Sequence, residues 1–214
     1  MGKRSDGQST RAKLLEAGAE VFAQKGYRDT TVHDICEKAH TNVASVNYYF
    51  GSKEKLYAQV WRRAFDQAQA VYPIRGGLDE TAPVEERLGA LVHSFVNQML
   101  DRGRLGCSGQ ILLMEMAHPT EAIDMVRTDA LQPIHIWVMQ IMRDFLGPQS
   151  TDRQAALCCM SVVHQCLGLG HRKGKRPPAI ERLLADEPEH IAEHIYQFSV
   201  AGIGVVRKQV DRST

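Results

Sequence analysis

The sequence predicts an all-α fold, and three observations support this. Apolar residues recur at intervals of three and four along most of the chain, which is the period of a helix with one buried face. Gly and Pro stand at the ends of these stretches, and no stretch alternates apolar and polar residues as a half-buried strand does. With 214 residues, 43% of them hydrophobic and 24% charged, the chain can bury a helical core.

The first two predicted helices have recognisable ends. Ser9 or Thr10 is a good N-cap for the first helix, and Gly26 ends it because glycine readily adopts the backbone conformation that closes helices. The segment Thr31–Asp34, with sequence TVHD, has the form of a capping box. It predicts a second, short helix that begins directly after Thr31.

A tight turn at residues 40–42 separates this short helix from the next. Asn42 is a good N-cap for a third helix that runs to about Phe50. Gly51 then breaks the helix, and Ser52 can cap a fourth, long helix over residues 53–71. The spacing therefore predicts four helices within the first 71 residues.

The rest of the chain also has helical periodicity. Helices are expected at about 83–103, 106–117, 120–147, 152–170 and 188–209. Pro133 lies inside the third of these, and proline has no N–H to donate within a helix. We therefore expect that helix to kink or split near residues 130–132.

Three short helices with a tight turn before the third are typical of a helix-turn-helix unit, whose third helix enters the DNA major groove. Val46 and Phe50 are four residues apart and share the face that packs inward. The outward residues are Val43, Ala44, Ser45, Asn47 and Tyr48. Asn47 can bond adenine through its amide, and Val43 or Ala44 can contact a thymine methyl group. The Tyr48 and Tyr49 hydroxyls and Lys53 can reach phosphates.

Residues 14–57, LLEAGAEVFAQKGYRDTTVHDICEKAHTNVASVNYYFGSKEKLY, resemble the DNA-binding domain of the TetR/AcrR family of bacterial repressors. The resemblance rests on the phenylalanine, Gly-Tyr, Thr-Thr, isoleucine, Tyr-Phe and Lys-Glu-x-Leu positions. By position it implies base contacts from His33, Val43, Ala44, Ser45 and Asn47. It also implies phosphate contacts from Thr31, Tyr48, Tyr49 and Lys53.

The sequence departs from the family pattern at three positions. His40 stands where the family usually has glycine, so we expect a histidine at positive φ, at a modest cost. Thr41 replaces the usual apolar residue of the turn, and Asn47 stands where tyrosine is common. The operator sequence therefore cannot be carried over from other members.

The resemblance divides the chain at residue 52. Residues 1–52 form the DNA-binding domain, with a basic N-terminal arm that carries Lys3, Arg4, Arg11 and Lys13. Residues 53–214 form a helical domain for ligand binding and dimerisation. The helix at 188–209 has a seam for a partner helix, which we assign to Ile191, Ile195, Phe198, Gly202 and Val205. The apolar helix at 152–170 is expected to join it in a four-helix homodimer interface.

The ligand pocket is predicted from apolar and polar residues of the later helices. We assign to it Phe95, Met99, Gln110, Met114, Met116, His135, Trp137, Cys159 and His164. Methionines suit a cavity that adapts to several ligands. Three short segments of this domain, GQILLMEMAHPTEAID, IERL and PEHIAEHIYQFSVAGI, resemble the CecR/CerR-type branch of the family, which is associated with drug-related and transport genes.

The sequence therefore predicts a cytoplasmic homodimeric repressor that binds a palindromic DNA operator and is released by a small molecule. No secretory signal or membrane segment is expected, and neither are a metal, a cofactor or enzymatic activity. One alternative is a metal- or redox-responsive regulator of the same fold, using His190 and His194 or the cysteines Cys158, Cys159 and Cys166. Another is a helical adaptor that binds only proteins.

Overall fold

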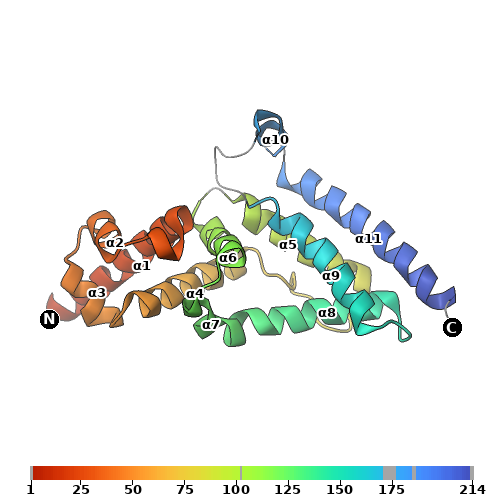
Figure 1. Cartoon of the computed structure of the whole chain (residues 1–214), viewed down its shortest axis with the longest axis horizontal. Coiled ribbons are helices and arrows are strands. Elements are labelled where there is room, and N and C mark those ends of the chain that lie inside the picture. Colours follow the sequence, from red (N-terminus) through yellow and green to blue (C-terminus); the bar gives the residue numbers. More distant parts are fainter. Residues whose placement is uncertain (1, 102, 171–176, 185–186, 213–214) are drawn as a thin grey trace. The chain divides into compact units, whose positions relative to one another are not determined.

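The computed structural model describes residues 2–101, 103–170, 177–184 and 187–212, and these residues form helices and loops without a strand. They fold into two compact units. The first unit comprises residues 1–68 and 102–130, and the second comprises residues 69–101 and 131–214 (Figure 1). The all-α prediction is confirmed.

The N-terminal unit contains the predicted helix-turn-helix. Its helices are α1 (Gly2–Asp29), α2 (Val32–Ala39) and α3 (Val43–Phe50), followed by α4 (Lys53–Val71). Leu14 and Phe22 of α1, Ile35 of α2 and Val46 of α3 are fully buried. Each such side chain contributes about 1.5–3 kcal/mol by leaving water, so a small shared core fixes the three helices.

The predicted helix ends largely agree with the structure. Gly26 has φ 77° and interrupts α1 as expected. The helix begins at Gly2 rather than at Ser9 or Thr10, so neither residue is its N-cap. The side chains of residues 1–8, which include Lys3 and Arg4 of the predicted basic arm, lie outside the part that the structure describes.

The same unit also contains a segment from the middle of the chain. The 3-10 turn Arg104–Gly106, helix α6 (Cys107–Ala117) and helix α7 (Glu121–Val126) belong to it, and α6 packs on α1. Helix α4 approaches α1 closely at Gly18, where an added Cβ would lie 2.7 Å from Val60 Cγ2. The compact unit thus extends beyond the helix-turn-helix motif itself.

The second unit is a bundle around a continuous apolar core. It is built from α5 (Val84–Leu100), α8 (Gln132–Leu146), α9 (Asp152–Leu167) and α11 (Pro188–Arg212), and the short α10 (Pro178–Leu183) belongs to the same unit. Its core side chains include Leu91, Trp137, Met142 and Val162. Helix α7 gives way to a π-helical segment over 127–131 and α8 then starts with Pro133 in its first turn, as predicted.

Candidate nucleic-acid interface

Helix α3 presents one face of mixed polar and small apolar residues to solvent. Val46 and Phe50 are buried, at 0% and 5% exposed, and they hold the helix against α1 and α2. The predicted base-contact residues Val43, Ala44 and Asn47 are exposed, and Ser45 is half-buried. The inward and outward faces therefore follow the predicted four-residue spacing.

The turn before α3 fixes the direction of that helix. His40 adopts the left-handed conformation, with φ 51°, and its N–H bonds to the last carbonyls of α2. Thr41 N donates to Cys36 O at 2.9 Å, which closes the turn. Asn42 then caps α3, because its side-chain oxygen accepts from Ala44 N at 2.9 Å. The expected positive φ at position 40 is thus present.

The start of α2 is held by the predicted capping box. Thr31 Oγ1 accepts from Asp34 N at 3.1 Å, and Thr31 N donates to Asp34 Oδ2 at 2.8 Å. A hydrogen bond from Lys25 and those from Thr31 keep the pKa of Asp34 well below its usual range. Thr31 Oγ1 also donates to Asp34 Oδ2 at 2.8 Å, so its proton already has an acceptor. His33, in the first turn of α2, is exposed beside this cap.

Lys53 lies at the start of α4, on the ring of Tyr27. Its Nζ is 4.3 Å from the ring centroid, a cation–π contact that supports the lysine. Tyr27 Oη donates to Glu54 Oε1 at 2.5 Å. This bond lowers the pKa of Glu54 to about 2, and desolvation together with the same bond raises the pKa of Tyr27 to about 12. Tyr27, one of the positions that carry the family resemblance, thus holds Lys53 in place, a role that the sequence does not indicate.

The two tyrosines of α3 differ in exposure. Tyr48 is 82% exposed, whereas Tyr49 is half-buried. Their rings pack edge to face with centroids 4.8 Å apart, an arrangement that aromatic pairs favour.

The end of α3 is also contacted by Arg11 of α1. The Arg11 guanidinium lies over the Phe50 ring, 5.4 Å from its centroid, and donates a hydrogen bond to Gln59 of α4. Arg11 therefore braces the far end of α3.

A buried polar network joins α4 to α6 within the N-terminal unit. Tyr57 Oη donates to Glu115 Oε1 at 2.5 Å, and Thr120 N donates to Glu115 Oε2 at 2.9 Å. Trp61 Nε1 donates to Ser108 O at 3.2 Å. Burial, and then the bond to Glu115, raises the pKa of Tyr57. The sequence reading assigned Glu115 no such role, because its partners are distant in the chain.

Comparison with known proteins places this geometry in a family. Residues 14–60 match the family described as "Bacterial regulatory proteins, tetR family". Residues 84–203, more than half of the chain, match the C-terminal domain of the HTH-type transcriptional dual regulator CecR. The chain belongs to the TetR family. It is a TetR-type DNA-binding transcriptional regulator and not an enzyme, which confirms both predictions.

Relatives and a solved structure agree with this assignment. The chain is 39% identical over 88 residues to the HTH-type transcriptional repressor KstR2 of Mycobacterium tuberculosis, an alignment that covers 41% of this chain and 43% of that protein. It is therefore matched over less than half of that relative's length. It is 22% identical over 180 residues to CecR of Shigella flexneri, covering 79% of this chain and 78% of the relative.

Among solved structures, the fold resembles that of AibR in complex with isovaleryl coenzyme A and operator DNA. The TM-score is 0.65 at 15% identity, with 88% of this chain and 97% of AibR covered. At this identity the likeness establishes the fold, and the TetR-type arrangement of a helix-turn-helix followed by a helical domain is confirmed.

The predicted ligand-pocket residues of this TetR-family chain are distributed over both compact units. Gln110, Met114 and Met116 lie in the first unit, and Phe95, Met99, His135, Trp137, Cys159 and His164 lie in the second. Trp137, Met99 and Cys159 are buried, whereas His135 and His164 are exposed. Trp137 Nε1 is buried and has no hydrogen-bond partner among the described residues.

The predicted dimer seam divides into a buried and an exposed part. Ile195 is buried in the core of its own unit, and Ile191 packs against that core. Phe198, Gly202 and Val205 are exposed. Only these three are therefore available to a partner, because α11 turns Ile195 inward.

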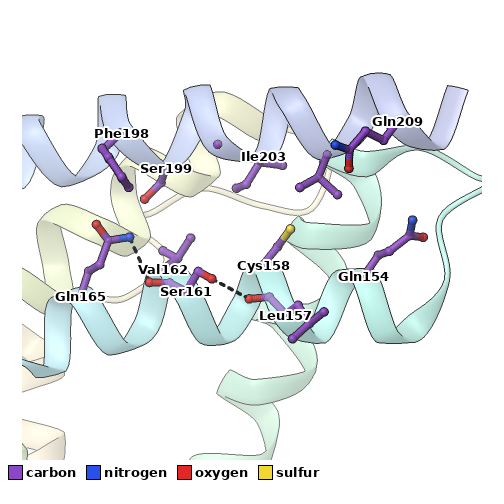
Figure 2. Close-up of a pocket in the computed structure, with 12 residues that line it drawn as sticks. Gln154, Leu157, Cys158, Ser161, Val162, Gln165, Phe198, Ser199, Ile203 and Gln209 are labelled. Carbon is purple, nitrogen blue, oxygen red and sulfur yellow. Dashed lines mark hydrogen bonds between the residues drawn. The ribbon is translucent and has the colours of Figure 1, made fainter. Parts of the chain in front are cut away.

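A groove of about 440 Å³ lies beside these exposed residues, between α9 and α11. It is lined by Gln154, Leu157, Cys158, Ser161, Val162, Gln165, Phe198, Ser199, Gly202, Ile203, Val206 and Gln209 (Figure 2). None of the predicted ligand-pocket residues lines it. Leu157, Ser161 and Gln165 recur at a spacing of four, which is the sequence signal that could have identified the α9 side.

Metal and redox chemistry receive no support from the described side chains. No three His, Cys, Asp or Glu residues in the described ranges are grouped so that they could hold a metal ion. All five cysteines are buried, and none of them forms a disulfide. Burial raises the pKa of Cys158 and Cys159, and that of Cys166 to about 12, which favours the protonated form of these three thiols. No described helix is long and apolar enough to cross a bilayer.

Proposed function

We propose that this regulator is a cytoplasmic, homodimeric repressor that binds a palindromic operator and leaves it when a small molecule binds. The observation that carries the proposal is the exposed face of α3, on which Val43, Ala44 and Asn47 stand free while Val46 and Phe50 anchor the helix. An amide and small apolar groups are the side chains that read adenine and thymine in the major groove.

The flanking groups fit phosphate binding. Lys53 is supported by the Tyr27 ring, and Tyr48 carries a hydroxyl on a largely exposed ring. His33 and Thr31 stand at the start of α2, where free N–H groups attract anions. Because Thr31 Oγ1 already donates to Asp34, we expect its phosphate contact to contribute less to the free energy of DNA binding than the contact made by Lys53.

Dimerisation follows from the same proposal. One recognition helix offers too few base contacts to select a site against a genome of competing sequences. Two copies held about 34–36 Å apart read successive major grooves, so the operator must be palindromic. Phe198, Gly202 and Val205 of α11, with Leu157 of α9, form an exposed apolar face suited to this role.

For the effector we propose a small molecule with an apolar body, bound by the helical domain. A ligand releases DNA only if it binds one conformation of the regulator more tightly than the other. Helix α4 runs without a break from Lys53 into the residues of the second unit. A shift of α4 on ligand binding would therefore move a phosphate contact directly.

The experiment is a titration of a palindromic duplex, selected from random sequence by the protein itself, at several salt concentrations. We expect steep salt dependence, because each neutralised phosphate releases counterions. Lys53→Ala should weaken binding to all sequences alike and lower the salt slope by about one. A duplex with the same bases in scrambled order serves as the control. Binding that does not depend on salt, or that is equally tight to the selected and the scrambled duplex, would contradict the proposal.

The effector is tested by thermal shift with two panels, straight- and branched-chain acyl-CoA thioesters and drug-like amines. AibR was solved with isovaleryl coenzyme A, which is why thioesters form the first panel. A ligand that raises the melting temperature must also release the selected duplex. If no compound does both, the small-molecule part of the proposal fails and the DNA-binding part stands.

A further inference from the structure

A buried carboxyl group in the N-terminal unit has no part in the proposed DNA contacts. Glu115 of α6 is 5% exposed, and it accepts hydrogen bonds from Tyr57 Oη of α4 and from Thr120 N. Glutamate is rarely buried unless it is paired. An apolar side chain would fill the same space without the cost of removing a carboxyl group from water. The contacts of Glu115 therefore indicate a role beyond packing.

The Tyr57 hydroxyl that Glu115 holds belongs to a ring on which Tyr27 packs. Tyr57 is fully buried, and its ring centroid lies 5.1 Å from that of Tyr27. The Tyr27 ring in turn supports Lys53, whose Nζ is 4.3 Å from the ring centroid. A shift of the Tyr57 ring would thus disturb Tyr27 and, through it, Lys53. Two aromatic rings connect the buried carboxyl group to the proposed phosphate contact.

The end of α6 and the loop after it also contact both residues beside Tyr27. At Gly26, an added Cβ would lie 3.0 Å from Met114 Sδ, so α1 and α6 approach closely there. Arg28 Nη2 donates to Pro119 O at 3.4 Å. All of these residues belong to one compact unit. The segment of α1 that carries Tyr27 therefore rests on the part of the chain that carries Glu115.

We propose that Glu115 is a positioning residue for DNA binding. It holds the Tyr57 hydroxyl and so keeps the Tyr27 ring where that ring supports Lys53. An ammonium group that folding has already placed loses less conformational freedom when it contacts a phosphate. The inference rests on the proposed phosphate contact of Lys53 and goes further, because it gives a buried residue a role in that contact.

The main test is a double-mutant cycle between Glu115 and Lys53, measured by fluorescence anisotropy on the full chain. Glu115→Ala should weaken binding about two- to tenfold, because Lys53 must then be ordered when DNA binds. The loss should be the same for the selected and the scrambled duplex, because a phosphate contact carries no sequence information. In a Lys53→Ala background, Glu115→Ala should change the affinity by less than about twofold, because the group that it positions is gone.

Glu115→Gln is the conservative variant. Its amide oxygen can accept from the Tyr57 hydroxyl, and its NH2 group can donate to the Thr120 hydroxyl, which lies 2.8 Å and 3.0 Å from the two Glu115 oxygens. Glu115→Gln should therefore keep most of the parental affinity. Tyr57→Phe removes the same hydrogen bond from the α4 side and should also weaken binding. It takes the place of Glu115→Ala in the cycle if that variant does not fold.

Trp61→Phe is the matched control. Trp61 Nε1 of α4 donates to Ser108 O of α6 at 3.2 Å, so this substitution removes another hydrogen bond between the same two helices. Trp61 lies one turn farther from Lys53 than Tyr57 does, and its ring stacks on Phe65, farther along α4. Trp61→Phe should lower stability and bind both duplexes like the parent. Circular dichroism checks that each variant is folded at the temperature of the binding measurement.

The outcomes separate the inference from the proposed function. If Lys53→Ala leaves the affinity and the salt slope unchanged, the proposed phosphate contact fails and the inference fails with it. If Lys53→Ala weakens binding, the inference alone is overturned when folded Glu115→Ala binds like the parent or when its loss persists in the Lys53→Ala background. It is also overturned when Trp61→Phe causes an equal loss or when Glu115→Gln binds no better than Glu115→Ala. A loss that depends on Lys53 and that Glu115→Gln avoids supports the inference.

Discussion

Two glycines on helices of the two compact units differ in their surroundings. In the N-terminal unit, Gly18 of α1 faces Val60 so closely that an added Cβ would lie 2.7 Å from its Cγ2. In the second unit, Gly202 of α11 has nothing within 4 Å of the same atom. The first glycine is needed for packing that the chain completes by itself. The second faces open space on an exposed helical surface.

One polar site in each unit can be compared in the same way. Within the N-terminal unit, the Glu115 carboxyl is bonded by Tyr57 and Thr120, all from the same unit. In the groove of the second unit, the Ser199 hydroxyl is buried without a partner. An unbonded buried polar group costs about 1–3 kcal/mol, and the described part of the N-terminal unit also contains two such hydroxyls, those of Thr41 and Ser108. Each of the following changes tests one side of this comparison.

The largest expected effect comes from opening the closed network. Glu115→Ala leaves the buried Tyr57 hydroxyl and the partly buried Thr120 N–H without their acceptor, which should lower the free energy of unfolding by about 3 kcal/mol. Urea denaturation followed by circular dichroism measures it. Glu37→Ala, at an exposed glutamate of α2, should change stability by less than about 0.5 kcal/mol. Equal effects of the two variants would show that the network does not hold this unit together.

The second prediction compares two glycines directly. Gly18→Ala forces a methyl group against Val60, which is 1% exposed, and should destabilise the chain by about 1–3 kcal/mol despite the better helix propensity of alanine. Gly204→Ala meets open space and should stabilise by about 0.5–1 kcal/mol. The same denaturation curves apply. Shifts of the same sign would remove the distinction between packed and open glycines.

The third prediction concerns a residue that the N-terminal unit does not need for folding. Asn47 is exposed on α3, so Asn47→Ala should leave the melting temperature unchanged. It should weaken binding to the selected operator by about 1–3 kcal/mol while non-specific binding stays nearly intact. Fluorescence anisotropy on specific and scrambled duplexes measures both. Equal losses on the two duplexes would make Asn47 a backbone contact.

Much of the N-terminal unit could be predicted from sequence because its signals are local. The capping box at Thr31, the Asn42 cap and the break at Gly26 each depend on residues within a few positions of one another. The positive φ of His40 was expected from the resemblance, because the family usually has glycine at this position. Local hydrogen bonds and turns leave a mark in short segments, so their positions could be predicted almost to the residue.

The features that escaped prediction depend on residues far apart in the chain. Tyr57 and Glu115 are separated by 58 positions, and no periodicity relates them. On α11, the alternating spacing of four and three residues predicted that Ile195 and Phe198 both face a partner helix. In the structure, Ile195 is buried in the core of the second unit and Phe198 is exposed. The seven-residue pattern does not say which neighbour a helical face meets, so the sequence could not separate the core of the protomer from its outer surface.

The smallest expected effect is electrostatic, and it concerns the hydrogen bond between Tyr27 and Glu54 beside Lys53. It tests whether this exposed part of the N-terminal unit is held as firmly as its buried interior. Tyr27 Oη donates to Glu54, and this bond is the main reason why the pKa of Glu54 falls from 4.5 to about 2. A depressed pKa means that the contribution of this bond to stability is complete above pH 4.5 and is lost as pH falls toward 2.

Tyr27→Phe should return the pKa of Glu54 toward 4.5 and remove that part of the acid sensitivity of folding. Carboxyl-detected NMR titration of both proteins measures the two pKa values. Because phenylalanine keeps a ring beneath Lys53, operator affinity should change less than in Lys53→Ala. If Glu54 already titrates near 4.5 in the parent, its carboxylate is solvated and the Tyr27 hydroxyl does not hold it.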